Sequence, residues 1–387
     1  MTPADLSLTV LHAVRRAVGD GALRVAVPER VTVERPRPGG HGDWVSSVAL
    51  KLAGAAGRKP LDVAEILRER LQRSPGIAAV DVTGPGFLNL TLATGAQQRL
   101  VREILLRGRR YGWCAPTGQL AQADFRPDVR AAVTADAVRR ILLSQGFLVR
   151  TRCEGAADPA WAELGVRIGA DAEVQAEVQF EGRRDRLPAD VAPRPAPPAG
   201  SDRLSTEVAP HPAPHAGSAI APRPAPHTPR ELVRRLGVDA ARWGLLSAAG
   251  HDAPRLGDDL LRQHEGNPLF RVRYAHSRTR ALLRNAEQLG FRSAAEQHVE
   301  DGQALADVLG DHPLVLASAA RLRAPDRVAR HLEATADALL DFQHTVLPLG
   351  DEKPSAAHRS RLALAEAAGT VLAGGLSLLG IRAPDQM

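Results

Sequence analysis

The chain is poor in cysteine, lysine and aromatic residues, and each shortage excludes a class of protein. Two cysteines among 387 residues predict neither a disulfide framework nor a paired-cysteine metal site. Aromatic residues make up only 3% of the chain, so its cores must be mainly aliphatic and few rings are left to stack on bases. No apolar run reaches the roughly 20 residues that cross a bilayer, and no secretory leader is evident. We therefore expect a cytoplasmic protein without a membrane partner.

Basic residues are unevenly distributed along the chain. Residues 1–115 carry 17 basic and 10 acidic side chains, residues 116–228 carry 13 and 14, and residues 229–387 carry 20 of each. A cationic segment suits a polyanion such as RNA, because lysine and arginine neutralise phosphates and release counterions. The alternative is a general preference for arginine, which supplies 47 of the 50 basic residues. Charge by itself therefore leaves nucleic-acid binding open.

Residues 1–115 have the pattern of an α/β module. Amphipathic helical segments flank two extended segments, residues 78–82 and 86–92, which a Gly-Pro-Gly turn joins. Residues 116–186 add a helix at 130–143, a strand at 147–153 and an alternating strand at 172–181. This middle part is too short for a complete catalytic domain.

The composition changes again at residue 187. Residues 187–228 are rich in proline and repeat the pattern APRPAPP, APHPAPH and APRPAPH, which predicts an extended, disordered linker. The histidines of these repeats form either a solvated spacer or a metal-binding tract, and the absence of neighbouring cysteine or carboxylate favours the spacer. No metal site is predicted.

Residues 229–387 predict a bundle of amphipathic helices. On the helix after Pro268, an apolar stripe that includes His276 must face the core, and His276 is interpreted as a packed histidine. Arg273, Arg280 and Arg284 share another face and form a basic ridge that could hold phosphates. The alternative is that these arginines pair with acids on neighbouring helices.

Two segments carry motifs typical of one enzyme family. The C-terminal segment contains GVDAAR at 237–242, NP at 267–268, YAHSR at 274–278 and LGI at 379–381, and the N-terminal segment contains ALKLA at 49–53 and GPGFLN at 84–89. Together they resemble the arginyl-tRNA synthetases over residues 1–115 and 229–387. The resemblance implies an N-terminal module that contacts the tRNA elbow, a class I catalytic remnant at 116–186, and an all-α anticodon-binding domain of the DALR type.

The resemblance also implies which residues touch tRNA. In the family an aromatic ring and an amide of the N-terminal module contact the D-loop, and the matching residues are Phe87 and Asn89. Stacking a base on a ring is worth about 1–3 kcal/mol. The alternative is that Phe87 belongs to the core of its strand.

On the anticodon side, the resemblance points to two tyrosines on the helix after Pro268 and to the C-terminal residue. Tyr274 and Met387 match, whereas Arg271 replaces the first tyrosine and Arg273 replaces a glutamine. We expect Arg271, Arg273 and Arg280 to contact phosphates, or in the case of Arg271 to stack on a base.

The catalytic signatures of the family are not found. Class I synthetases hold ATP with an HxGH signature and a KMSKS lysine loop. Only Arg126-Pro127-Asp128-Val129 separates Phe125 from Arg130, which matches the arginine beyond the first signature, and no lysine occurs between residues 60 and 352. The sequence thus predicts a degenerate family member that is not an enzyme, with no catalytic residues and no cofactor.

The predicted activity is binding of tRNA, with arginine tRNA as a candidate, without aminoacylation. One alternative is an accessory subunit that supplies tRNA contacts to a full-length arginyl-tRNA synthetase. Another is a protein-interaction scaffold that does not bind RNA, which the neutral charge balance of residues 229–387 allows.

Overall fold

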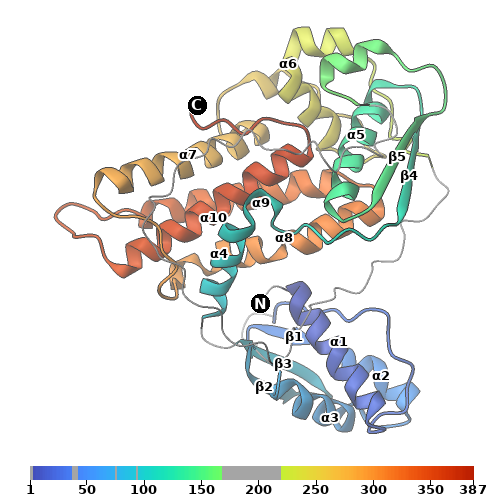
Figure 1. Ribbon diagram of the computed structural model, residues 1–387, viewed down its shortest axis with the longest axis vertical. Coiled ribbons are helices and arrows are strands. Elements are labelled where there is room, and N and C mark those ends of the chain that lie inside the picture. The colour runs from blue at the N-terminus through green and yellow to red at the C-terminus, as the bar shows by residue number, and fades with distance from the viewer. Residues whose placement is uncertain (1–2, 37–41, 75, 93–94, 168–218) are drawn as a thin grey trace, which may run out of the picture.

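The computed structural model describes the chain except for residues 1–2, 37–41, 75, 93–94 and 168–218 (Figure 1). Its described residues form two hydrophobic cores. One lies in an N-terminal domain that ends at Leu92, and the other joins a small α/β unit to a C-terminal helical bundle. The predicted strand at 172–181 and residues 187–218 of the predicted linker lie outside the described residues.

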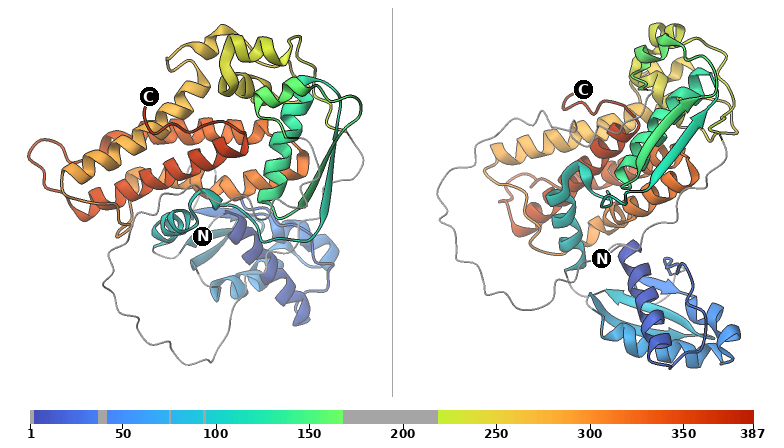
Figure 2. Two further views of the ribbon diagram at one scale, coloured as in Figure 1. Left: turned by 45° about the horizontal axis from the view of Figure 1, so that its top comes forward. Right: turned by 45° about the vertical axis from the view of Figure 1, so that its right-hand side comes forward.

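The N-terminal domain is a three-stranded antiparallel sheet with three helices. The strand order is β1-β3-β2, and the elements are α1 (Pro3–Gly19), β1 (Trp44–Ser46), α2 (Val48–Ala56), α3 (Pro60–Gln72), β2 (Ile77–Thr83) and β3 (Phe87–Leu92). Pro60 occupies the first turn of α3, where its missing N–H costs no hydrogen bond. Figure 2 shows this domain beside the bundle rather than within it.

The register of the sheet fixes which side chains share a face. Leu90 pairs with Val80 and with Trp44, and all three are buried in the domain core. Because side chains alternate along a strand, Phe87 and Asn89 lie together on the opposite face of β3. The sheet therefore presents both predicted D-loop residues on one side.

The next helix joins the second core. Helix α4 (Ala96–Arg107) and the short η1 (Gly108–Arg110) pack through Leu100, Val101 and Ile104 against the bundle. Gln97 adds a two-way link, because its amide donates to the Val299 carbonyl at 3.0 Å and accepts from the Val299 N–H at 2.7 Å. Helix α4 therefore packs with the second core, whereas the described residues up to Leu92 form the first.

The α/β unit contains a two-stranded parallel sheet. Strands β4 (Leu120–Phe125) and β5 (Leu148–Cys153) are connected by α5 (Val129–Ser144), and η2 (Pro159–Leu164) follows. The helix at 130–143 and the strand at 147–153 are confirmed. Ile220, from the last part of the predicted linker, is buried and bridges Phe125, so residues near 220 belong to this unit.

The helical bundle begins with α6 at Pro229. Its α-helices are α6 (Pro229–Leu246), α7 (Pro268–Gln288), α8 (Gln303–Leu322), α9 (Asp326–Phe342) and α10 (Ala356–Leu378). Short 3-10 turns are η3 (Asp258–Leu261), η4 (Glu300–Gly302) and η5 (Gln343–Thr345). A Thr228–Glu231 capping box begins α6, and none of the described helices is long and apolar enough to cross a membrane.

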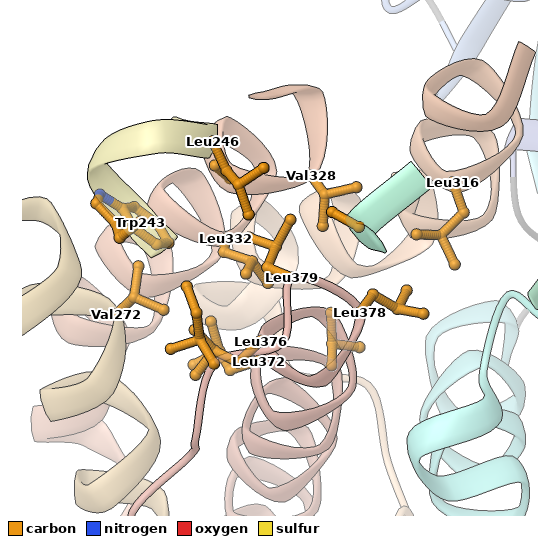
Figure 3. Packing of buried hydrophobic residues seen from close by; sticks show 14 of the residues in the cluster. Trp243, Leu246, Val272, Leu316, Val328, Leu332, Leu372, Leu376, Leu378 and Leu379 are labelled. Carbon is orange, nitrogen blue, oxygen red and sulfur yellow. The ribbon is translucent and has the colours of Figure 1, made fainter. Parts of the chain in front are cut away.

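The last helix, α10, lies at the centre of the bundle. Figure 3 shows Leu372 and Leu376 of α10 packed with Val272 of α7 and Leu332 of α9. Glycine permits this close approach: a Cβ at Gly369 would lie 2.3 Å from Thr279 Oγ1, and one at Gly375 would lie 2.4 Å from Leu332 Cδ2. The glycine-rich closing segment is therefore a packing surface.

Candidate nucleic-acid interface

Helix α7 is set in place by its first residues. The Asn267 side chain accepts from the Phe270 N–H at 3.3 Å and donates to the carbonyls of Leu260 and Arg262 at 2.9 Å. Pro268 follows at the first helical position. These contacts cap the helix and tie it to the preceding loop, which explains the need for the Asn-Pro pair.

The apolar stripe of α7 faces the core, as predicted. Val272, Ala275 and His276 are buried. His276 Nδ1 lies 2.8 Å from the Pro384 carbonyl of the C-terminal tail. Burial lowers the pKa of His276, so the neutral ring that donates this bond is favoured. The interpretation of His276 as a packed core residue is confirmed.

Two half-buried aromatic rings stand next to each other on α7. The rings of Phe270 and Tyr274 are stacked, with centroids 5.7 Å apart and an angle of 12° between their planes. The four-residue spacing puts them on adjacent turns. The family motif predicts Tyr274 but not Phe270, although the four-residue spacing between the two rings is visible in the sequence.

The arginines of α7 and its neighbourhood are partly engaged with carboxylates. Arg271 lies 3.2 Å from Asp337 of α9, Arg273 lies 4.0 Å from Asp239 of α6, and Arg280 lies 3.2 Å from Asp385 of the tail. Arg273 and Arg280 therefore pair with acids on neighbouring elements, which is the alternative to a free phosphate-binding ridge. The Arg280–Asp385 pair is exposed and worth at most about 1 kcal/mol, so a phosphate can displace that carboxylate. Asp239, in contrast, is buried, so its pair with Arg273 is held more firmly.

The C-terminal tail closes this surface. Arg382 Nε lies 3.1 Å from the Asp239 carboxylate, and Asp385 reaches Arg280. Met387 is 54% exposed at the end of the tail. The structure therefore brings Arg273, Arg280 and the tail to one side of the bundle.

The N-terminal domain holds the other pair of predicted residues. Phe87 is 37% exposed, whereas Asn89 is buried and its amide nitrogen donates to Thr83 Oγ1 at 2.7 Å and to the Asp81 carbonyl at 3.3 Å. Phe87 is thus outside the core of the domain. Asn89 instead braces the β2–β3 hairpin beside that ring.

Arg130, which matches the family arginine beyond the ATP signature, has a structural position here. Its guanidinium is buried and donates to five backbone carbonyls, at 2.6–3.0 Å, those of Arg223, Leu245, Ala248, Ala249 and Asp252. It caps the end of α6 and fastens the α/β unit to the bundle. The spacing of residues along the sequence does not predict these hydrogen bonds.

The described residues contain no group of three or more His, Cys, Asp or Glu side chains placed to hold a metal ion. Burial raises the pKa of the Cys114 thiol, which lies 3.5 Å from Gln145 Oε1.

Comparison with known proteins agrees with the arrangement of the two terminal parts. Residues 7–92 match the arginyl tRNA synthetase N terminal domain, and residues 272–387 match the DALR anticodon binding domain. The curated arginine–tRNA ligase of Frankia alni is 32% identical and that of Renibacterium salmoninarum 29%, each with full coverage of both chains. The first alignment extends over 555 positions, so the relative contains segments with no counterpart among these 387 residues.

Solved structures give the same fold. The arginyl-tRNA synthetase of Thermus thermophilus has a TM-score of 0.65 at 16% identity, with full coverage of both chains. The enzyme of Plasmodium falciparum has a TM-score of 0.61 at 9% identity, covering 100% of this chain and 99% of the other.

The expectation that the chain is not an enzyme is contradicted by these comparisons. Relatives that align with its whole length are arginine–tRNA ligases. The expectation rested on two missing sequence signatures, but ATP requires donors and charges at the right places in space, whatever their positions in the sequence. Similarity along the entire sequence and in the overall fold shows that the chain belongs to the arginyl-tRNA synthetase family.

Proposed function

We propose that this protein binds tRNA, arginine tRNA first of all, through two separate surfaces. The observation that supports this most strongly is the pair of matches at opposite ends of the chain, to the family's N-terminal domain and to its anticodon-binding domain. The N-terminal domain, taken as residues 1–92, is the elbow-binding part, residues 116–186 correspond to the class I core, and residues 229–387 are the anticodon-binding part.

The first surface centres on Phe87. Its ring is 37% exposed on the sheet face opposite the buried Leu88 and Leu90. An unpaired D-loop base can stack on this ring, and base stacking tolerates any base because each has a π-face. Asn89 supports the hairpin that presents the ring.

The second surface centres on Tyr274. The stacked Phe270–Tyr274 pair offers an aromatic edge. Arg271, Arg273 and Arg280 lie on the same helix, each paired with a carboxylate that a phosphate would have to replace. Arg271 is better suited to contact a phosphate, or to stack on the face of a base, than to read the hydrogen-bonding groups of a particular base. We therefore infer that it contacts the RNA backbone or stacks on a base. Met387 lies at the exposed end of the neighbouring tail.

The test compares an intact arginine tRNA transcript with its isolated anticodon stem-loop and its isolated D-arm in a filter-binding titration. Two surfaces on one RNA raise affinity by an effective-concentration gain of about 10²-fold or more. We expect the intact tRNA to bind more tightly than either piece by at least that factor. Equal affinity for the tRNA and one piece would reduce the interface to a single surface.

A second candidate function is delivery of tRNA to a separate full-length arginyl-tRNA synthetase. The observation that favours it is the length of the alignment, 555 positions against 387 residues. Aminoacylation with ATP and arginine decides between the cases. Turnover by this chain itself assigns the ligase reaction to it, whereas turnover that rises only when a full-length synthetase is added supports the accessory role.

A further inference from the structure

The segment that follows the N-terminal domain carries more than half of the net positive charge of residues 1–115. Residues 95–110 contain five arginines and one carboxylate, Glu103, whereas residues 1–92 carry 12 basic and nine acidic side chains. We name the five arginines of α4 and η1 the α4 ridge, and they are Arg99, Arg102, Arg107, Arg109 and Arg110. All five are exposed.

Packing of α4 fixes the direction of this ridge. Leu100, Val101 and Ile104 are buried against the bundle, so the opposite face of the helix points outward. Leu106 on that face is 88% exposed, which shows that no described part of the chain covers it. The ridge is therefore an open surface on a rigid support.

The segment that carries the ridge contains a single carboxylate, Glu103. Arg107 pairs with Glu103 at 3.3 Å, and both side chains are at least 37% exposed, so the pair is weak. The Arg110 guanidinium lies 5.6 Å from the centroid of the Trp113 ring, within the range of a cation–π contact. Arg102 donates to the Ala295 carbonyl at 2.6 Å.

The ridge adjoins both proposed RNA surfaces. Figures 1 and 2 show α4 between the N-terminal domain and α10. The Arg109 carbonyl lies about 3 Å from where a Cβ of Gly374 on α10 would stand.

We propose that the α4 ridge binds the phosphate backbone of the tRNA between the elbow and the anticodon arm. This inference rests on the proposed function and adds a third contact to it. Five exposed guanidinium groups with one carboxylate among them fit a row of phosphates, and they contact the backbone of any sequence, because arginine there positions the RNA without reading bases.

The test measures tRNA affinity as a function of salt for the full chain and two variants. The ridge variant carries Arg99→Gln, Arg107→Gln, Arg109→Gln and Arg110→Gln. The control variant removes the same charge from exposed arginines elsewhere, with Arg230→Gln, Arg234→Gln, Arg321→Gln and Arg327→Gln. Each lost phosphate contact lowers the slope of log K against log salt by about 0.9.

We expect the magnitude of this slope to fall by about 3.6 in the ridge variant, which loses four contacts, and the affinity to fall on the order of 10³- to 10⁴-fold at 0.1 M salt. The control variant should lose less than 1 in the slope. A smaller variant with only Arg109→Gln and Arg110→Gln should lose about half as much as the ridge variant, which guards against a folding defect.

Three results distinguish the two proposals. If the unmodified chain binds no tRNA, the proposed function fails. If it binds, but the ridge and control variants have the same slope, only the ridge inference is overturned. If the ridge variant loses slope with an unchanged melting temperature, the inference stands.

Discussion

Asp136 Oδ2 lies 2.7 Å from Nη2 of Arg242, and the two side chains are 0% and 1% exposed. Arg242 also donates to the carbonyls of Leu164 and Leu379 at 2.8 Å. Burial would raise the pKa of Asp136, but the guanidinium groups of Arg140 and Arg242 outweigh it and hold that pKa below its ordinary value. One ion pair thus joins the α/β unit, α6 and the residue after α10.

The first prediction concerns this pair. Asp136→Asn leaves the Arg242 charge buried without its anion, and removing one partner of a buried pair costs about 3–5 kcal/mol. Urea denaturation should show a loss of that size in the free energy of unfolding. Glu163→Gln, which breaks the exposed Arg230–Glu163 pair at 3.0 Å, should cost less than about 1 kcal/mol. Equal effects of the two substitutions would refute the structural role.

The second prediction separates the two interpretations of Phe87. Because the ring is exposed, Phe87→Ala should weaken tRNA binding by about 1–3 kcal/mol while leaving the melting temperature nearly unchanged. Leu88→Ala, at the fully buried neighbouring position, should lower stability by about 2–5 kcal/mol. A large stability loss in the Phe87 variant would favour a core role for the ring.

The third prediction is that acid destabilises the packing of α8 against α9. His312 and His331 are buried with ring centroids 5.1 Å apart, and among the described residues His312 Nδ1 and His331 Nε2 have no hydrogen-bond partner. Burial lowers the pKa of His331 from 6.5 to about 4 and that of His312 well below its ordinary value. Both imidazoles are therefore neutral in the folded protein at neutral pH.

As the pH falls below 6.5, the unfolded chain binds protons that the folded protein excludes, so the free energy of unfolding decreases. For His331 the decrease amounts to roughly 3 kcal/mol between pH 6.5 and 4. His331→Gln should flatten this part of the pH profile in urea denaturation, and His298→Gln, at an exposed histidine, should not. Identical profiles for both variants would contradict the prediction.

The fourth prediction concerns Arg130. A lysine cannot reach five carbonyls with one ammonium group, so Arg130→Lys should leave several buried carbonyls unpaired and cost about 2–4 kcal/mol. Hydrogen exchange should accelerate at the amides of residues 245–252. Arg126→Lys, at an exposed position four residues earlier, is the matched control and should change neither quantity.

Local elements of this fold could be predicted from the sequence where periodicity and capping agree. Asn267-Pro268 marks the start of α7, and the apolar stripe through Val272 and His276 predicts its buried face. That α4 packs with the second core could not be predicted from the sequence. Helix α4 has the pattern of any amphipathic helix, and its partner, α10, is about 270 residues away in the sequence. The five carbonyls around Arg130 and the burial of Asp136 with Arg242 also depend on tertiary packing alone.

The candidate site likewise combines residues that sequence motifs predict with contacts that depend on tertiary packing. Motifs located Phe87, Asn89, Tyr274 and the tail, but the ion pairs of Arg273 with Asp239 and of Arg280 with Asp385 appear only in the fold. The prediction that the chain is not an enzyme is wrong, because relatives that align with the whole chain are arginine–tRNA ligases.

The most direct measurement is to crosslink this protein to RNA in its own cells and to sequence the attached RNAs. Binding through two surfaces predicts that tRNA dominates the recovered RNA, with crosslinks in both the D-loop and the anticodon arm, and that Phe87→Ala removes the D-loop crosslinks selectively. Recovery of no RNA, or of RNA without enrichment of tRNA, would contradict the central claim.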